Sequence, residues 1–142
     1  MLSFKLNLKG LEKGKELTKD KAKRVLMKSM FKMEELAVNK APVHTGFLRQ
    51  NINLFPQILN ANYELKSNAL YSEAMEYGTR PFYAPIAPLK EWARLKLGDE
   101  SIGYAVQKKI AKTGIKSAPY MRPSFWEVKN FWVSKYAKQE LK

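Results

Sequence analysis

The sequence contains no cysteine and only one histidine, His44. The lack of cysteine excludes a disulfide framework and a thiolate metal site. A single histidine leaves nothing with which to build a His/Cys metal cluster. No run of about 18 apolar residues occurs, so we expect no membrane span. The first nine residues alternate apolar and polar side chains and lack the continuous apolar stretch of a signal peptide.

Acidic residues are also scarce: 13 Asp and Glu stand against 26 Lys and Arg, which gives a net charge of +13. The excess is divided between the two ends, with +6 in residues 1–40, zero in residues 41–107 and +7 in residues 108–142. Such a field favours nucleic acid or acidic protein surfaces and speeds encounter with them. It does not by itself identify the partner.

A chain of 142 residues with 45% hydrophobic and 12% aromatic side chains is long enough to bury a core, and we expect one globular domain over residues 1–142. Residues 1–9 alternate as a strand does, and residues 17–39 repeat apolar side chains at helical spacing. The pattern predicts an α+β fold. In it, a long N-terminal helix packs on a small antiparallel sheet, with additional helices in the C-terminal half.

The long helix carries two apolar stripes. The main stripe has the 3–4 spacing of a core-facing helix and contains Ala22, Val25, Leu26, Ser29, Met30, Met33, Leu36 and Ala37. Met27, Phe31 and Val38 lie roughly opposite, at about 100° per residue. Either a further element of the same chain covers this second stripe, or a neighbouring subunit contacts it.

Residues 51–59 and 63–70 predict two strands of a hairpin with a polar turn at residues 60–62. Pro56 cannot donate to a ladder and indicates an edge strand or a bulge. A short helix over residues 71–77 is expected to end at Gly78 and Thr79. Residues 80–88 hold three prolines and should be irregular or extended.

Pro88 suits the first turn of a helix that ends before Gly98. Asp99 or Ser101 can cap a following helix that ends at Gly114. A last helix should begin near Pro123. Its apolar stripe comprises Met121, Phe125, Val128, Trp132 and Tyr136, whereas Trp126, Phe131 and Val133 fall outside it.

No convincing active site appears, and we expect no enzyme activity, catalytic residue, cofactor or metal. His44 lies in a Pro–Thr–Gly turn, where a structural or exposed role is expected. Glu73 and Glu76 are three residues apart, and an exposed charged face explains them better than acid–base chemistry. Glu76 can also pair with Arg49 or Arg80. Basic residues interleaved with aromatic ones keep a nucleic-acid-binding protein as the alternative.

Residues 41–52 link the long helix to the rest of the chain. Pro42 stops the helix, and Thr45 and Gly46 favour a tight turn into the sheet. Residues 40–49 read KAPVHTGFLR, which resembles the KAPVDTGxLR signature of the tail-completion, minor tail or head–tail joining proteins of long-tailed bacteriophages. His44 replaces the aspartate and so removes a turn-capping carboxylate.

Two further blocks match in the expected order. Residues 75–80, MEYGTR, resemble the block VEFGT, and residues 118–124, APYMRPS, resemble QPFLRPA with its apolar bulk retained. Residues 88–98 resemble a helical insertion that many members carry. The matched positions are Pro42, Thr45, Gly46, Leu48, Arg49, Glu76, Gly78, Thr79, Pro119, Arg122 and Pro123. We expect Arg49 and Arg122 to form buried or interfacial ion pairs.

The resemblance implies a structural protein of a phage or prophage virion, made in the cytoplasm of the bacterial host. It would act at the neck or head-proximal end of the tail by binding other tail and neck proteins. It would form a homo-oligomeric ring around the DNA channel, with six subunits as the expected number, and no membrane is involved. The residues expected at interfaces are Met27, Phe31, Val38, Arg80, Phe82 and Tyr83.

Overall fold

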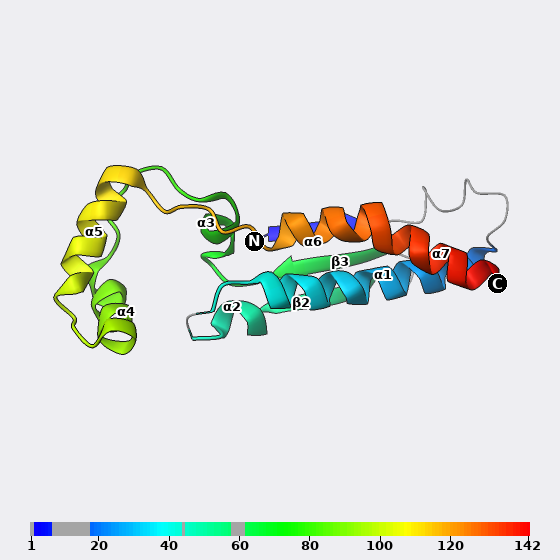
Figure 1. Cartoon of the computed structure of the whole chain (residues 1–142), viewed down its shortest axis with the longest axis horizontal. Coiled ribbons are helices and arrows are strands. Elements are labelled where there is room, and N and C mark those ends of the chain that lie inside the picture. Colours follow the sequence, from blue (N-terminus) through cyan, green and yellow to red (C-terminus); the bar gives the residue numbers. More distant parts are fainter. Residues whose placement is uncertain (1, 7–17, 44, 58–61) are drawn as a thin grey trace. The chain divides into compact units, whose positions relative to one another are not determined.

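The computed structural model describes residues 2–6, 18–43, 45–57 and 62–142 (Figure 1). The chain forms two compact units. The first unit comprises Met1–Glu76 and Ala118–Lys142, and the inserted unit comprises Tyr77–Ser117. The chain therefore leaves the first unit once and returns to it 41 residues later.

Three strands build the sheet of the first unit: β1 (Leu2–Leu6), β2 (Ile52–Gln57) and β3 (Asn62–Ser67). They are antiparallel in the order β1-β3-β2, which confirms the predicted N-terminal strand, the hairpin and the edge position of Pro56. Asn62 begins β3, and the rest of the predicted turn lies outside the described residues. The backbone N–H of Leu54 donates to Glu34 Oε1 at 3.2 Å, so it points away from β3.

Helix α1 (Lys19–Lys40) confirms the predicted long helix. Thr18 caps its start by accepting from the N–H of Lys21 at 3.4 Å. Its end falls at Ala41, whose extended backbone is what a following proline requires. All members of the main apolar stripe are buried except Leu36, which is partly buried and packs against the core.

The C-terminal helix lies along α1 (Figure 1). It consists of α6 (Met121–Glu127), a π-helical turn η3 (Val128–Trp132) and α7 (Val133–Leu141), and it begins two residues before the predicted start. In the π turn, the N–H of Val133 donates to the carbonyl of Val128, five residues back. This extra residue shifts the register, so Trp132 and Val133 both pack against the core. The prediction assumed a regular helical period, which places Val133 outside the apolar stripe.

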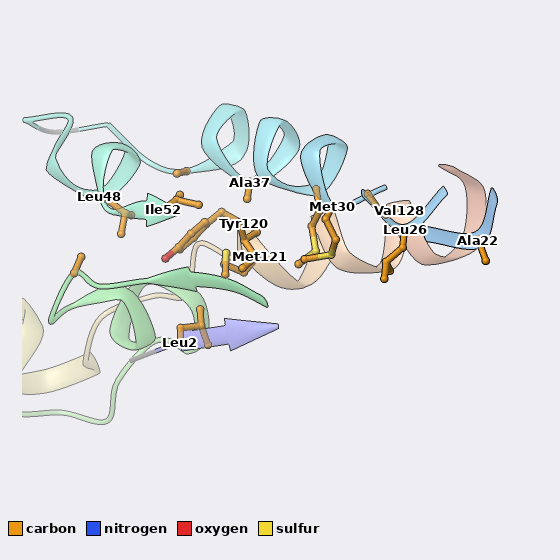
Figure 2. Packing of buried hydrophobic residues seen from close by; sticks show 14 residues of the cluster. Leu2, Ala22, Leu26, Met30, Ala37, Leu48, Ile52, Tyr120, Met121 and Val128 are labelled. Atoms are coloured by element: carbon orange, nitrogen blue, oxygen red, sulfur yellow. The ribbon is translucent and has the colours of Figure 1, made fainter. Parts of the chain in front are cut away.

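The core lies where α1, α6 and the sheet meet, which confirms the predicted α+β architecture. Figure 2 shows Met30, Tyr120 and Met121 converging there, with Leu2 reaching in from β1. The Phe4 and Phe125 rings, 5.4 Å apart between centroids, tie β1 to α6. Each fully buried apolar side chain of the core, such as Met30 or Met121, contributes roughly 1.5–3 kcal/mol to stability.

One short helix was not predicted. Helix α2 (Phe47–Gln50) lies between the turn and β2, where the sequence suggested direct entry into the sheet. Gly46 precedes it with φ of 83°, a conformation that glycine adopts without strain. The Asn51 side chain donates to the carbonyl of Phe47 at 2.8 Å and closes its end. A single turn is too short to show a helical period in the sequence.

Helix α3 (Ser72–Tyr77) confirms the predicted short helix, and the inserted unit then holds α4 (Ile86–Leu97) and α5 (Ile102–Thr113). Both end at the predicted glycines, Gly98 and Gly114. Before α5, Asp99 Oδ1 accepts from the N–H of Ser101 at 2.8 Å. Ser101 occupies the cap position, but its side chain makes no capping hydrogen bond.

Candidate functional site

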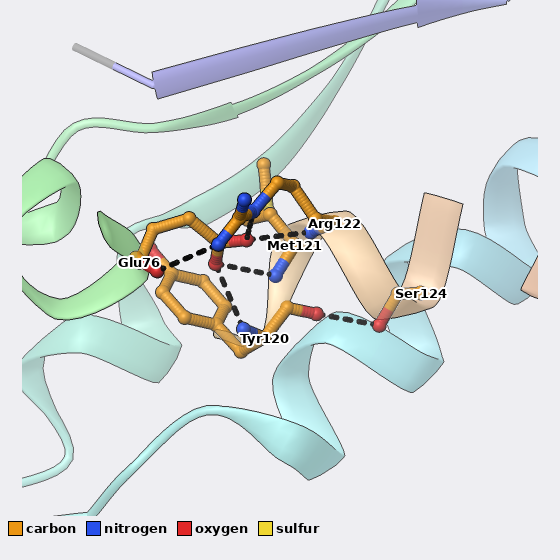
Figure 3. Close-up of polar contacts among 5 residues, drawn as sticks. All are labelled: Glu76, Tyr120, Met121, Arg122 and Ser124. Atoms are coloured by element: carbon orange, nitrogen blue, oxygen red, sulfur yellow. Dashed lines mark hydrogen bonds and ion pairs between the residues drawn. The ribbon is translucent and has the colours of Figure 1, made fainter. Parts of the chain in front are cut away.

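The Glu76 side chain is fully buried and its carboxylate faces the start of α6 (Figure 3). Oε2 accepts from the backbone N–H groups of Tyr120 and Met121 at 2.8 and 2.9 Å. Oε1 accepts from the N–H of Arg122 at 2.8 Å and from its Nε at 3.2 Å. The first N–H groups of a helix have no partner within it, and they carry the positive end of the helix dipole. Glu76 thus caps α6 from 44 to 46 residues away in the sequence.

This geometry corrects two expectations about Glu76. Its ion-pair partner is Arg122 rather than Arg49 or Arg80. It also shares no exposed face with Glu73, because Glu73 is exposed whereas Glu76 is fully buried. A buried charge is tolerated only with compensating hydrogen bonds, and α6 supplies them. No local pattern reveals such a partner, since the chain first passes through the whole inserted unit.

A second contact joins the same two segments. The N–H of Ala118 donates to the carbonyl of Met75 at 2.7 Å, next to the Glu76 cap. The Tyr120 side chain is fully buried there, and burial raises the pKa of its hydroxyl above the ordinary tyrosine value. Pro119 is exposed, and Pro123 lies in the first turn of α6. The second and third motif blocks therefore meet at one place.

The first motif block closes the end of α1. Arg49 Nε donates to the carbonyl of Ala41 at 3.1 Å, and its terminal nitrogen donates to the carbonyl of Asn39 at 3.3 Å. These carbonyls lie at the helix C-terminus, where a cation is favoured. Arg122 therefore forms the expected ion pair with a buried carboxylate, whereas Arg49 binds backbone oxygens instead.

The rest of the first block shapes the turn before β2. Thr45 Oγ1 accepts from the N–H of Phe47 at 3.4 Å, and Leu48 is buried in the core. Pro42 directly follows Ala41, the residue that caps the C-terminal end of α1. His44 lies outside the described residues.

Gly78 and Thr79 lie where the two ends of the inserted unit are hydrogen-bonded to each other. The N–H of Thr79 donates to the carbonyl of Ile115, and the N–H of Ile115 donates to Thr79 Oγ1, both at 2.9 Å. Gly78 has φ of 76°, and a Cβ there would lie 2.7 Å from the oxygen of Ile115. Only glycine fits this close approach.

The residues expected at interfaces differ in exposure. Met27 and Phe31 on α1 are 39% and 55% exposed, whereas Val38 is partly buried and packs against the core. Of the two alternatives for the second stripe, coverage by the same chain therefore applies to Val38. In the inserted unit, Arg80 and Phe82 are exposed and Tyr83 is 83% exposed.

Within the described ranges, no three His, Cys, Asp or Glu side chains gather as they would around a metal ion. No helix in the described part of the chain is long and apolar enough to cross a membrane.

Comparison with known proteins finds no match to a protein-family model, to a curated protein or to a solved structure.

Proposed function

We propose that this protein is a structural component of a phage virion that completes the tail and joins it to the head. The proposal rests on the resemblance of three sequence blocks to the tail-completion proteins and on the order of those blocks. Its action is assembly through binding, with no turnover and no cofactor. The working form is a ring of identical subunits, with six as the expected number.

The junction at Glu76 is the observation that carries the proposal. Glu76 belongs to the second block, and the groups that it binds belong to the third block. Arg49 of the first block holds the end of the α1 helix that the same block terminates. Blocks that resemble the family only by chance would not be expected to contact one another in this way. Blocks that form one structural motif would be.

The surfaces available for assembly are apolar and exposed. Met27 and Phe31 present one patch on α1, and Phe82 with Tyr83 presents another on the inserted unit. Exposed apolar patches rimmed by charge are typical of protein–protein contacts. We assign these surfaces to neighbouring subunits and to other tail and neck proteins.

Deletion of the gene from the genome that carries it tests the proposal. Electron microscopy of induced cells should show filled heads and tails that are not joined, and the intact gene supplied in trans should restore whole particles. The Phe82→Ala/Tyr83→Ala variant should fold, yet fail to restore joining. Normal particles from the deletion strain would refute the proposal.

Light-scattering mass at low and high salt tests self-association separately. A discrete ring mass at both salt concentrations supports apolar subunit contacts. In that case Met27→Ala/Phe31→Ala should lower the mass, while Leu70→Ala, which removes an exposed side chain away from that patch, should not. A monomer at both concentrations would refute a ring that forms without the tail.

A further inference from the structure

Both acidic residues of the C-terminal helix accept hydrogen bonds from basic side chains of α1. Glu127 accepts from Lys40 Nζ at 2.6 Å and from Trp132 Nε1 at 3.3 Å. Glu140 accepts from Arg24 Nε at 2.9 Å and from Lys28 Nζ at 2.6 Å. Residues 118–142 contain no other acid. The other charged side chains of this helix are all basic.

Three lysines of this helix are exposed: Lys129, Lys135 and Lys138. None of them has a carboxylate partner among the residues that the structure describes. Instead, Lys129 Nζ lies 4.8 Å from the centre of the Trp126 ring, and Lys135 Nζ lies 4.5 Å from that of Trp132 and 5.8 Å from that of Phe131. These distances are typical of cation–π contacts. They hold ammonium groups and aromatic rings together at the surface.

Both rings are exposed and held in position. Trp126 is 51% exposed and Phe131 is 57% exposed. Phe125 meets Trp126 edge to face with centroids 5.5 Å apart, and Trp132 meets Phe131 in the same way at 5.3 Å. Phe125 and Trp132 pack against the core, so each exposed ring has a fixed support. Such preorganisation lowers the entropy cost of binding a ligand.

We propose that this face, formed by Trp126, Lys129, Phe131, Lys135 and Lys138, binds single-stranded nucleic acid. Lysines beside exposed aromatic rings form the usual means of binding it, because the lysines contact phosphates and the rings stack on bases. Trp126 and Phe131 are five residues apart on the C-terminal helix, and the π turn between Val128 and Trp132 has a longer repeat than an α-helix. Bases in a duplex are already stacked and paired, so they cannot engage both rings.

Two other polyanions fit the face less well. A membrane surface binds a helix through a continuous apolar side, but here that side is packed into the core through Val128, Phe125 and Trp132. An acidic protein surface offers carboxylates to the lysines and no flat partners for the two rings. The site does not depend on the proposed role in tail assembly.

Fluorescence anisotropy of a labelled oligothymidylate of about 15 nucleotides tests the site, since single-strand sites span up to about 16 nucleotides. Trp126→Ala and Phe131→Ala should each weaken binding about tenfold, because stacking contributes roughly 1–3 kcal/mol per base. Trp126→Phe keeps a ring and should restore most of the affinity. The far-UV circular dichroism of each variant checks that it is folded.

The lysines are tested against a matched control. Lys129→Gln/Lys135→Gln/Lys138→Gln should lower the slope of log K against log salt by about 2, at roughly 0.7 per phosphate contact. Lys108→Gln/Lys109→Gln/Lys112→Gln removes the same charge from α5 and should leave affinity within about twofold. Equal loss in both triple variants, or ring variants without effect, would overturn the proposal.

Competition decides the class of ligand. Unlabelled single strand should displace the probe at concentrations at least tenfold below those of duplex of the same sequence. Equal competition by duplex would overturn the stacking role. Preferential displacement by phosphatidylserine vesicles would overturn the proposal in favour of a membrane. Failed particle assembly in the deletion strain bears only on the proposed function, so the two proposals can fail independently.

Discussion

The two units of this protein are held together in different ways. In the first unit, α1, α6 and the sheet enclose a contiguous cluster of buried apolar side chains. In the inserted unit, only Ala84, Ala93 and Gly103 of the two helices and their leading loop are buried. Its helices instead approach at the backbone: a Cβ on Gly103 would lie 2.8 Å from the nitrogen of Lys90.

The comparison shows that side-chain volume stabilises the first unit, whereas close backbone contact organises the inserted one. Burial of small side chains removes little apolar surface from water, so it contributes little free energy. Regions with few buried contacts open at a lower free-energy cost than the core. The inserted unit also leaves large apolar side chains exposed, namely Tyr77, Phe82, Tyr83, Leu95, Leu97 and Tyr104. We therefore expect it to open locally while the first unit stays folded.

The largest effect should come from the cap that connects the distant segments of the first unit. Glu76→Ala leaves three backbone N–H groups of α6 without their acceptor and removes the carboxylate that pairs with Arg122 Nε. We expect a loss of about 3–5 kcal/mol in the free energy of unfolding, measured by urea denaturation. Glu73→Ala removes an exposed carboxylate from the same helix and serves as the control. Similar values for the two variants would show that Glu76 is not a structural cap.

A core truncation should rank next. Met30→Ala empties a fully buried position on α1 and should cost about 2–4 kcal/mol. Met27→Ala, one turn earlier and 39% exposed, should change stability by less than about 0.5 kcal/mol. In hydrogen exchange, Met30→Ala should speed exchange in the first unit far more than in α4 and α5. Equal acceleration in both units would contradict separate stabilisation.

The inserted unit has its own weak point at Gly114. Its φ is 74°, and a Cβ would lie within 3 Å of the backbone of Thr79 and Arg80. Gly114→Ala should cost about 2 kcal/mol and should raise exchange in α5 without loosening the first unit. Gly98→Ala has a similar φ of 78° but open space around it, so it should cost only about 1 kcal/mol. Equal costs would mean that the close approach is not what organises this unit.

The smallest effect should be a pH dependence of α7. Hydrogen bonds from Lys28 and Arg24 lower the pKa of Glu140 below the ordinary glutamate value. The unfolded chain therefore binds this proton more readily, so the contribution to stability is present above about pH 4.3 and fades as pH falls through the lowered folded pKa. Ion pairs between exposed side chains contribute little to the free energy of unfolding, so the expected effect is small.

Hydrogen exchange of α7 between pH 6 and pH 3, corrected for intrinsic rates, measures this effect. Glu140→Gln should remove the dependence, whereas α4 and α5 should not respond to the substitution. A pH dependence that persists in Glu140→Gln would assign the effect to another carboxylate, such as Glu127.

The sequence predicted those features that depend on local periodicity. The spacing of Val25, Met30 and Met33 identified the buried side of α1, and Pro56 identified an edge strand. The glycines that end α4 and α5 were also recognisable, because little else adopts a positive φ at a helix end.

Features that depend on distant contacts or on irregular backbone were not predictable. The cap that Glu76 places on α6 joins residues more than 40 positions apart, and only the position of Glu76 in a motif block indicated its importance. The π turn at Val128–Trp132 breaks the helical period that a uniform wheel assumes, so Val133 was misplaced. No composition signal marks where such an extra residue will be accommodated.

The outer edge of β2 limits how copies of this protein can polymerise. Glu34 occupies the outward N–H of Leu54, and Pro56, two residues on and facing the same way, has no N–H to offer. A fibril that grows by adding strand to strand needs a receptive edge on both sides of every sheet. This sheet lacks one, so edge pairing ends after two copies. A larger closed assembly must therefore use other contacts, such as those of the exposed side chains on α1 and in the loop before α4.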